Sequence, residues 1–413
     1  MHISAKKIIL DCVDLALKVS SPNQTLPRYL PTDNKTAVTV ISVGKAAASM
    51  AVEFERYWQG SIKGLAVVPY HYREPLKYFE QIEASHPIPD QMSVRAAGKV
   101  FELTNSLNSS DTVFVLLSGG SSSLICYPAG SINFLEKQKI NCALIRSGAN
   151  INEINCVRKQ LSAIKGGRLA AHCRPAKVYT FAISDVVGDD PSIIGSGPTI
   201  ADPTTPNDAI KILDKYDITT PASISHWLKR VHPEIGNLDN KSKNYTIISS
   251  GTMMLDKVAQ FSRKSNLDII NLGELEGDAC DIAWKTATYL ATIKPKIPTL
   301  LISGGEATVK LKGDGRGGPN SEYLLSLALN LKGNKNIFAL AVDTDGIDGS
   351  EDNAGAIITP DTLKDAQKIG LDLEAMLQNN DSYSAFLKLN SLILTGPTGT
   401  NVNDFRATLI LPE

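Results

Sequence analysis

Short apolar runs rich in β-branched residues alternate with segments of helical periodicity along the first half of the chain. Strands are expected at 37–44, 65–70, 112–120 and 177–184, since each is a compact apolar run that ends at a glycine or a polar loop. The segment 45–58 has the spacing of an amphipathic helix. Strand–loop–helix units of this kind predict a mostly parallel sheet covered by helices.

The hydrophobic pattern weakens between 201 and 245 and then starts again. Further strands are expected in the second half at 245–251, 267–273, 299–311, 336–346, 354–359, 391–399 and 406–411. A length of 413 residues suits two domains, and we expect them at 1–240 and 241–413. The sequence predicts an α/β fold in both, with some mixed strand directions in the second.

Composition and charge narrow the class of protein. Hydrophobic residues make up 43% of the chain and charged residues 21%, with a net charge of −1. This balance argues against nucleic acid or an anionic membrane as the partner. The six cysteines form no CxxC pair, and no apolar stretch approaches the ~20 residues that span a bilayer. The N-terminus is typical of an amphipathic helix rather than a signal peptide, so we expect a cytoplasmic enzyme.

Glycine-rich loops follow the expected strands, where ligands bind in open parallel sheets. Gly44 and Lys45 follow the first strand, and such a pair suits a phosphate or a carboxylate, although a surface lysine after a turn has the same pattern. The run 118–123, SGGSSS, exposes backbone N–H groups that can bind an anion, and a flexible turn is its alternative.

Two further loops carry charge. Four cations lie in 158–168, RKQLSAIKGGR, and form either a solvated helix face or a basic wall beside a phosphate loop. The loop 184–199, SDVVGDDPSIIGSGPT, carries acids that can bind Mg²⁺, position a hydroxyl group, or only cap turns.

The second half adds three loops. In 313–322, GDGRGGPNSE, an arginine stands among four glycines, which suits phosphate recognition. The run 343–349, DTDGIDG, lacks the glutamate of an EF-hand and is expected to be an acidic loop that faces the site. The run 395–404, TGPTGTNVND, could bind a nucleotide or an acid, with ordinary turn chemistry as the alternative. GxxxxGK[ST], GxSxG and a GxGxxG after the first strand are all absent.

These loops and one further motif, SHPIPD, give eight motifs along the chain. In order they are VGKAAASM, SHPIPD, LLSGGSSSL, RKQLSAIKGGRLA, SDVVGDDPSIIGSGPT, GRGGPNSE, DTDGIDG and TGPTGTNVND. Together they resemble the class II glycerate kinases, which are glycerate 2-kinases with a C-terminal MOFRL domain, and the archaeal members are expected to be the most similar. The resemblance runs from about residue 40 to residue 404. It implies a Rossmann-like three-layer N-terminal domain, a smaller α/β C-terminal domain, and an active site in the cleft between them.

The resemblance also implies a reaction, transfer of the ATP γ-phosphate to the 2-hydroxyl of D-glycerate with Mg²⁺ or another divalent metal. Lys45 and Arg316 match the family's proposed active-site cations. Pro319 departs from the pattern, because a second arginine is expected there, so a paired cationic clamp is in doubt. The enzyme is expected to be a monomer or a homodimer with no nucleic-acid or membrane partner.

Roles for the remaining candidates follow from that chemistry. Asp189 is the candidate for activating the 2-hydroxyl, and Asp190 and Asp345 are candidate metal ligands. Small, polar and cationic residues are expected to bind phosphate or substrate: Ser118, Gly119, Gly120, Ser121, Ser122, Lys165, Arg168, Gly315, Asn320, Thr398 and Asn401.

Two other functions fit parts of the pattern. One is an NAD(P)H-dependent reductase of hydroxypyruvate, whose substrate has nearly the same shape; the missing GxGxxG counts against it. The other is a non-catalytic protein that binds sugar phosphates, which leaves the GDD and DTDGIDG loops unexplained.

Overall fold

The chain forms two compact units that do not follow a simple division of the sequence. The computed structural model describes residues 2–230, 244–263 and 266–412. One unit is Leu26–Ile248, and the other joins Met1–Thr25 to Ser249–Glu413. The expected boundary at 240 lies outside the described residues. The expected placement of the first 25 residues in the N-terminal domain is wrong, because helix α1 (His2–Ser20) packs on α11, β11 and β14 of the other unit.

The unit Leu26–Ile248 is built on a six-stranded sheet of order β3-β2-β1-β4-β5-β6. The strands from β3 to β5 pair in parallel, which confirms the expected topology. Their bounds are β1 Val38–Val43, β2 Ile62–Pro69, β3 Phe79–Ala84, β4 Thr112–Leu117, β5 Lys177–Ile183 and β6 Tyr245–Ser249. The sequence did not indicate β3, which is an edge strand with a glutamate at its second and fifth positions.

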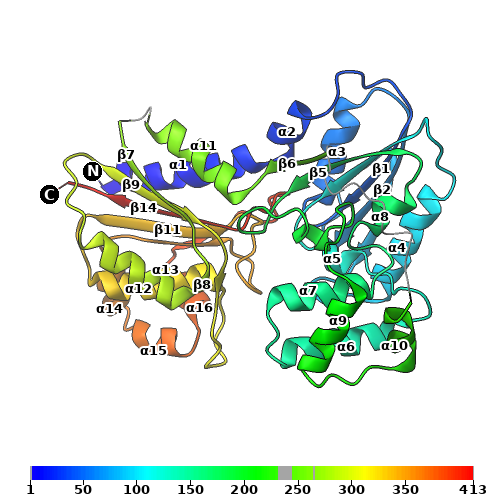
Figure 1. Cartoon of the computed structure of the whole chain (residues 1–413). Helices are drawn as coiled ribbons and strands as arrows, with labels where there is room; N and C mark the ends of the chain where they lie inside the picture. Colours follow the sequence, from blue (N-terminus) through cyan, green and yellow to red (C-terminus); the bar gives the residue numbers. More distant parts are fainter. Residues whose placement is uncertain (1, 231–243, 264–265, 413) are drawn as a thin grey trace. The chain divides into compact units, whose positions relative to one another are not determined.

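Helices cover this sheet and also form a cluster of their own. The helices are α3 Ala47–Tyr57, α4 Gln91–Thr104, α5 Ser121–Leu124, α6 Phe134–Arg146, α7 Ile151–Gln160, α8 Arg168–His172, α9 Pro206–Lys215 and α10 Ala222–Leu228, with short 3₁₀ turns η1 Leu26–Arg28 and η2 Ile194–Ser196. The helices α6, α7, α9 and α10 pack on one another around their own apolar core, as Figure 1 shows. This helical cluster was not predicted.

The other unit contains a mixed sheet of order β13-β12-β11-β14-β9-β7. Among the described residues of this sheet, β7 and β9 pair in parallel and the other strand pairs are antiparallel, so the expected mixed directions are confirmed. The strands are β7 Asp268–Glu274, β9 Thr299–Gly304, β11 Ile337–Asp343, β12 Gly355–Ile358, β13 Leu392–Ile393 and β14 Asp404–Ile410, with a separate pair β8 Gly277–Asp278 and β10 Ala307–Thr308.

Helices lie on both faces of this mixed sheet. Figure 1 shows α1 and α11 on one face and α12 and α13 on the other. The remaining bounds are α2 Pro22–Thr25, α11 Gly251–Arg263, α12 Ala279–Leu290, α13 Pro319–Leu331, α14 Thr362–Lys368, α15 Leu373–Gln378 and α16 Ser382–Lys388. The unit is therefore also a layered α/β structure.

Candidate active site

The loops after β1 and β4 lie against each other at the carboxyl edge of the parallel sheet. The Lys45 N–H donates to the Gly119 carbonyl at 2.8 Å, and the Ala46 N–H donates to Ser118 Oγ at 3.0 Å. A Cβ at Gly44 would lie 2.1 Å from Ser118 Oγ, so glycine is needed for this approach. The structure thus brings Lys45 together with the SGGSSS loop, with the lysine half-buried.

The SGGSSS loop also contacts two segments from elsewhere in the unit. Ser122 Oγ lies 3.0 Å from Ser196 Oγ in the loop after β5, and His86 Nδ1 lies 2.9 Å from Ser123 Oγ. The hydroxyl of Ser121 is buried and has no hydrogen-bond partner in the described part of the chain. A buried donor without a partner is expensive to keep, which favours a ligand at this loop.

Lys165 and Arg168 have different surroundings, although the sequence placed them in one group. Lys165 Nζ donates to the Ser122 carbonyl and, at 2.8 Å, to its hydroxyl, so this lysine joins the SGGSSS loop. Burial lowers the pKa of Lys165 to about 7. Arg168 donates to the carbonyls of Lys159 at 2.8 Å and Lys165 at 3.1 Å. Its guanidinium therefore stabilises the turn after α7.

In the acidic loop after β5, one carboxylate oxygen has no hydrogen-bond partner among the described residues. Asp189 has a left-handed φ of 56°, and its Oδ1 is buried with no hydrogen bond to the described residues. Asp190 is exposed and accepts the Ser192 N–H at 2.8 Å. Burial, followed by the charges of Asp189 and Asp190, raises the pKa of Tyr245. No sequence pattern linked Tyr245 to this loop, because it begins β6, which is distant from the loop along the chain.

The glycines around Arg316 have a packing role. The Gly315 N–H donates to the Asn379 carbonyl at 2.9 Å, and a Cβ at Gly315 would lie 2.4 Å from that oxygen. The Arg316 N–H donates to Asp381 Oδ1 at 3.1 Å. The glycine-rich loop is therefore held against the turn between α15 and α16, a structural reason that the sequence did not indicate.

The Arg316 side chain itself is held by two neighbours. Its guanidinium forms an ion pair with Glu351 and lies 4.6 Å from the centre of the Tyr383 ring. Tyr383 in turn donates its hydroxyl to Asp352 at 2.7 Å. More than half of the arginine side chain, 58%, stays exposed, so it remains available to an anion. Glu351 was missed because a lone acid in a polar turn has no distinctive pattern.

Helix α13 begins at Pro319, the residue that departs from the family pattern. Pro319 is the first helical residue, where a missing N–H costs nothing. The wholly buried carboxylate of Asp348 accepts the N–H groups of Asn320 and Ser321, each at 2.8 Å. The Asn320 side chain donates to Asp404 at 2.6 Å. Asp348 therefore caps a helix, and the expectation that the whole DTDGIDG loop faces the site is wrong for this residue.

Of the other candidates in this unit, Asp345 and Asn401 are buried and Thr398 is half-buried. Asp345 is 3% exposed and its Oδ1 accepts the Ile347 N–H at 2.9 Å. Thr398 donates its hydroxyl to the Thr344 carbonyl, and Asn401 is 4% exposed. Within this unit the structure groups Asp345 with Thr398, whose N–H donates to the Asp345 carbonyl at 3.1 Å.

No group of three or more His, Cys, Asp or Glu side chains that could hold a metal ion is found among the residues that the structure describes. Mg²⁺ usually keeps several waters and takes only one or two carboxylates together with substrate phosphates. The orphaned Oδ1 of Asp189 and the exposed Asp190 fit that mode of binding. Asp345 belongs to the other unit.

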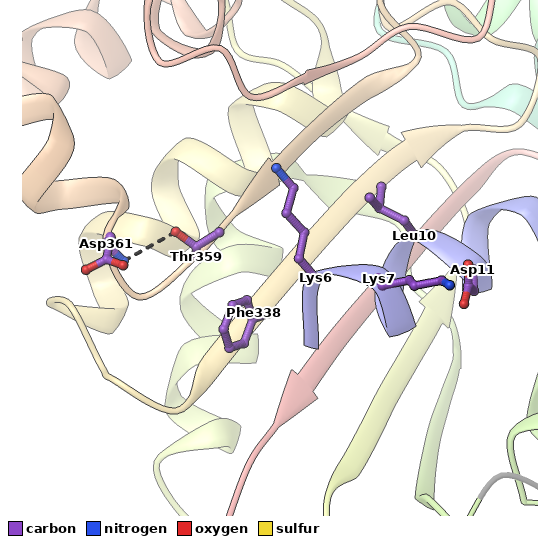
Figure 2. A pocket seen from close by; sticks show the side chains of 7 residues that line it. All are labelled: Lys6, Lys7, Leu10, Asp11, Phe338, Thr359 and Asp361. Carbon is purple, nitrogen blue, oxygen red and sulfur yellow. Dashed lines mark hydrogen bonds between the residues drawn. The ribbon is translucent and has the colours of Figure 1, made fainter. Parts of the chain in front are cut away.

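A pocket of about 440 Å³ lies beside α1 and the strands β11 and β12, and none of the candidate residues lines it (Figure 2). Its lining residues are Lys6, Lys7, Leu10, Asp11, Phe338, Thr359 and Asp361. None of them follows a glycine-rich loop, so we do not assign the pocket to the reaction. In the described ranges, no helix is long and apolar enough to cross a membrane.

Loops at the edge of a parallel sheet and a second layered unit with a mixed sheet define an α/β protein. Residues 8–229 match the family described as "Domain of unknown function (DUF4147)", and residues 299–404 match the MOFRL family. The chain belongs to the class II glycerate kinase family, as the order of its motifs indicates.

Known relatives cover nearly the whole chain. The D-glycerate 2-kinase of Thermotoga maritima is 38% identical over 99% of both chains. The crystal structure of glycerate kinase from that organism is similar with a TM-score of 0.88 and 36% identity, and the match covers 99% of this chain and 100% of the other. The glycerate 2-kinase of Pyrococcus horikoshii is 36% identical over 91% of this chain and 88% of its own. An Agrobacterium vitis protein, 42% identical over 99% of this chain and 95% of its own, is provisionally named a hydroxypyruvate reductase. The bacterial relatives named here are more similar than the archaeal one, contrary to expectation.

Proposed function

We propose that this protein transfers the γ-phosphate of ATP to the 2-hydroxyl of D-glycerate and releases 2-phosphoglycerate and ADP. The observation that supports this most strongly is the 38% identity with the D-glycerate 2-kinase of Thermotoga maritima, which extends over 99% of both chains. The eight motifs lie within that shared length, and four of them lie on loops of one sheet edge. A phosphoryl transfer enzyme needs groups that position reactants and neutralise charge, and these loops carry such groups.

The roles proposed for individual residues follow their surroundings. Lys45 and Arg316 are cations that keep part of their side chains accessible, which suits charge neutralisation on the transferring phosphoryl group. The SGGSSS loop, with the orphaned Ser121 hydroxyl, suits a phosphate or the glycerate carboxylate. Asp189, with its unpartnered carboxylate oxygen, is the proposed group that accepts the proton of the 2-hydroxyl.

The divalent metal is proposed to arrive with the nucleotide. When bound, Mg²⁺ would neutralise charge on the ATP phosphates. Asp190 is the exposed carboxylate on the acidic loop and is the proposed protein ligand in that unit. Asp345 is the weaker candidate because it is buried. We also propose a cytoplasmic location, which the six free cysteines support.

A hydroxypyruvate reductase is the alternative function that the names of the Agrobacterium vitis relatives support. A dinucleotide site would need a glycine fingerprint after β1 that receives a pyrophosphate. The chain has Gly44, Lys45 and then three alanines there. The kinase reaction therefore fits this edge of the sheet better.

One experiment separates the alternatives. The purified chain is incubated with ATP, Mg²⁺ and D-glycerate, and enolase is added to report 2-phosphoglycerate directly. A signal that needs an added phosphoglycerate mutase means that the 3-phosphate is formed, which contradicts the proposed regiochemistry. Loss of NADH absorbance with hydroxypyruvate, without ATP turnover, identifies the reductase. Binding of sugar phosphates with neither reaction identifies a non-catalytic protein.

A further inference from the structure

Lys137 is a lysine buried inside the unit Leu26–Ile248. It lies on α6, is 1% exposed, and its Nζ has no hydrogen-bond partner among the described residues. It shares one helix face with the buried Ile140 and Leu144, where an apolar side chain would satisfy the packing. An ammonium group that is buried without a partner costs several kcal/mol. Its presence on this face therefore needs a reason other than packing.

The charged neighbours of Lys137 are mostly cations. The groups that act on it electrostatically are the Cys126 thiol, Arg158 and Arg168, and those that act on Lys165 are Cys126, Lys137 and Arg158. Burial lowers the pKa of both lysines. No carboxylate is among these groups. Lys137, Arg158 and Lys165 thus form a positive cluster within the described residues.

One acid of this region, Asp202, already has other partners. Asp202 lies 3.6 Å from Lys159 Nζ and accepts from Gln160 Nε2 at 3.0 Å. Lys165, in contrast, donates only to neutral oxygens of Ser122 in the bonds that the structure shows. The positive cluster therefore adjoins the SGGSSS loop through Lys165.

We propose that Lys137, Arg158 and Lys165 form a binding site for a small oxyanion group, a phosphoryl group or a carboxylate, next to the SGGSSS loop. The inference rests on the proposed function, since ATP, D-glycerate and the product all carry such groups. It adds Lys137 and Arg158 to the residues that bind substrate. A bound oxyanion would supply the negative charge that the protein itself does not provide at this place.

Thermal unfolding of the full chain with separate ligands tests this site without any turnover. Wild type, Lys137→Met and Lys139→Met are each heated alone and with inorganic phosphate, with ATP and Mg²⁺, or with D-glycerate. Lys139 is an exposed lysine on the same helix and serves as the matched control. At least one ligand should raise the unfolding temperature of wild type and of Lys139→Met.

Lys137→Met should behave differently in two respects. Its ligand-free form should be at least as stable as wild type, because an uncompensated buried charge is replaced by an apolar side chain of similar length. Its affinity for the stabilising ligand should fall about tenfold or more, because a charge-assisted contact is lost. Stabilisation by phosphate or ATP assigns a phosphoryl group to the site, and stabilisation by D-glycerate alone assigns the carboxylate.

Two results overturn the proposal. One is a less stable ligand-free Lys137→Met protein with unchanged ligand affinity, which identifies a structural lysine. The other is the absence of any stabilisation of wild type by the three ligands. If Lys137→Met does not fold, Arg158→Met is measured in its place and must show the same loss of affinity. A protein without glycerate kinase activity still gives a decisive result here, so failure of the two proposals can be told apart.

Discussion

At the scale of single residues, Arg316 combines an exposed guanidinium with fixed surroundings. The ion pair with Glu351 and the ring of Tyr383 restrict its rotamers, while 58% of the side chain stays open to solvent. Preorganised charge is worth most in a transition state, because no reorganisation is then needed at the moment of reaction. This makes Arg316 a candidate for the chemistry and Glu351 a candidate positioning residue.

Replacement of Arg316 by alanine should lower kcat by about 10²-fold or more, as for loss of one transition-state charge contact. The measurement is the enolase-coupled assay at saturating ATP and D-glycerate, with circular dichroism to confirm folding. Arg56→Ala is the matched control, since Arg56 is 67% exposed and is also paired with a glutamate, Glu53. Turnover of Arg316→Ala near the level of the control would remove Arg316 from the chemistry.

Replacement of Glu351 by glutamine should lower kcat less than the loss of Arg316, because the arginine remains but is less well held. A double variant with Arg316→Ala should be no slower than Arg316→Ala alone, since Glu351 is proposed to act only through that side chain. Additive losses in this cycle would show that Glu351 has an independent role.

At the scale of elements, the N-terminus of α13 depends on one buried carboxylate from a distant loop. Asp348 accepts two backbone N–H groups of the first turn. Burial raises the pKa of this carboxyl from 3.8 to about 6. The loop that carries Arg316 leads directly into this turn, so the position of Asp348 affects both the helix and the glycine-rich loop.

The stability of the protein should therefore vary with pH through Asp348. Because its pKa is higher in the folded chain than in the unfolded one, the folded state binds the extra proton between about pH 4 and 6. The free energy of unfolding then falls as pH rises through that window, on the order of 2–3 kcal/mol from this group. The difference between wild type and Asp348→Asn in urea unfolding at pH 4, 5, 6 and 7 measures this effect. A difference that is constant with pH would contradict it.

Helix α9 begins at Pro206, inside the region 201–245 where the hydrophobic pattern of the sequence weakens. Thr205 and Asp208 form a capping box, and Pro206 opens the helix. The same residues that favour turns also favour helix starts. The local sequence could not decide between these two uses, and the apolar core that α9 shares with α7 decided for the helix.

At the scale of the whole molecule, the N-terminal helix belongs to the unit formed by the C-terminal half of the sequence. The buried face of α1 contains Ile9, Val13 and Ala16, and the helix packs on α11, β11 and β14. Because this unit is built from both ends of the chain, it can fold cooperatively only when both segments are present.

Ile9→Ala should therefore destabilise the unit that contains residues 249–413, by about 2–5 kcal/mol, since Ile9 is fully buried. Hydrogen exchange followed by mass spectrometry should show faster exchange in α11, β11 and β14 and little change in β1 and β4. Ile145→Ala, at a residue that is 58% exposed, is the control and should leave both units unchanged. Faster exchange confined to 26–248 would contradict the assignment of α1.

The sequence by itself determined the features that depend on neighbours in the chain. Apolar runs predicted most strands of both sheets, although not the edge strand β3, and the ordered glycine-rich loops indicated the family, because both are local patterns. Only the tertiary structure decided which of these loop residues lie together, such as Lys45 with Gly119, and which are used inside the fold, such as Asp348. It also decided that α1 joins the C-terminal unit and that Lys137 is buried. These outcomes depend on contacts between segments far apart in sequence, and no local pattern carries that information.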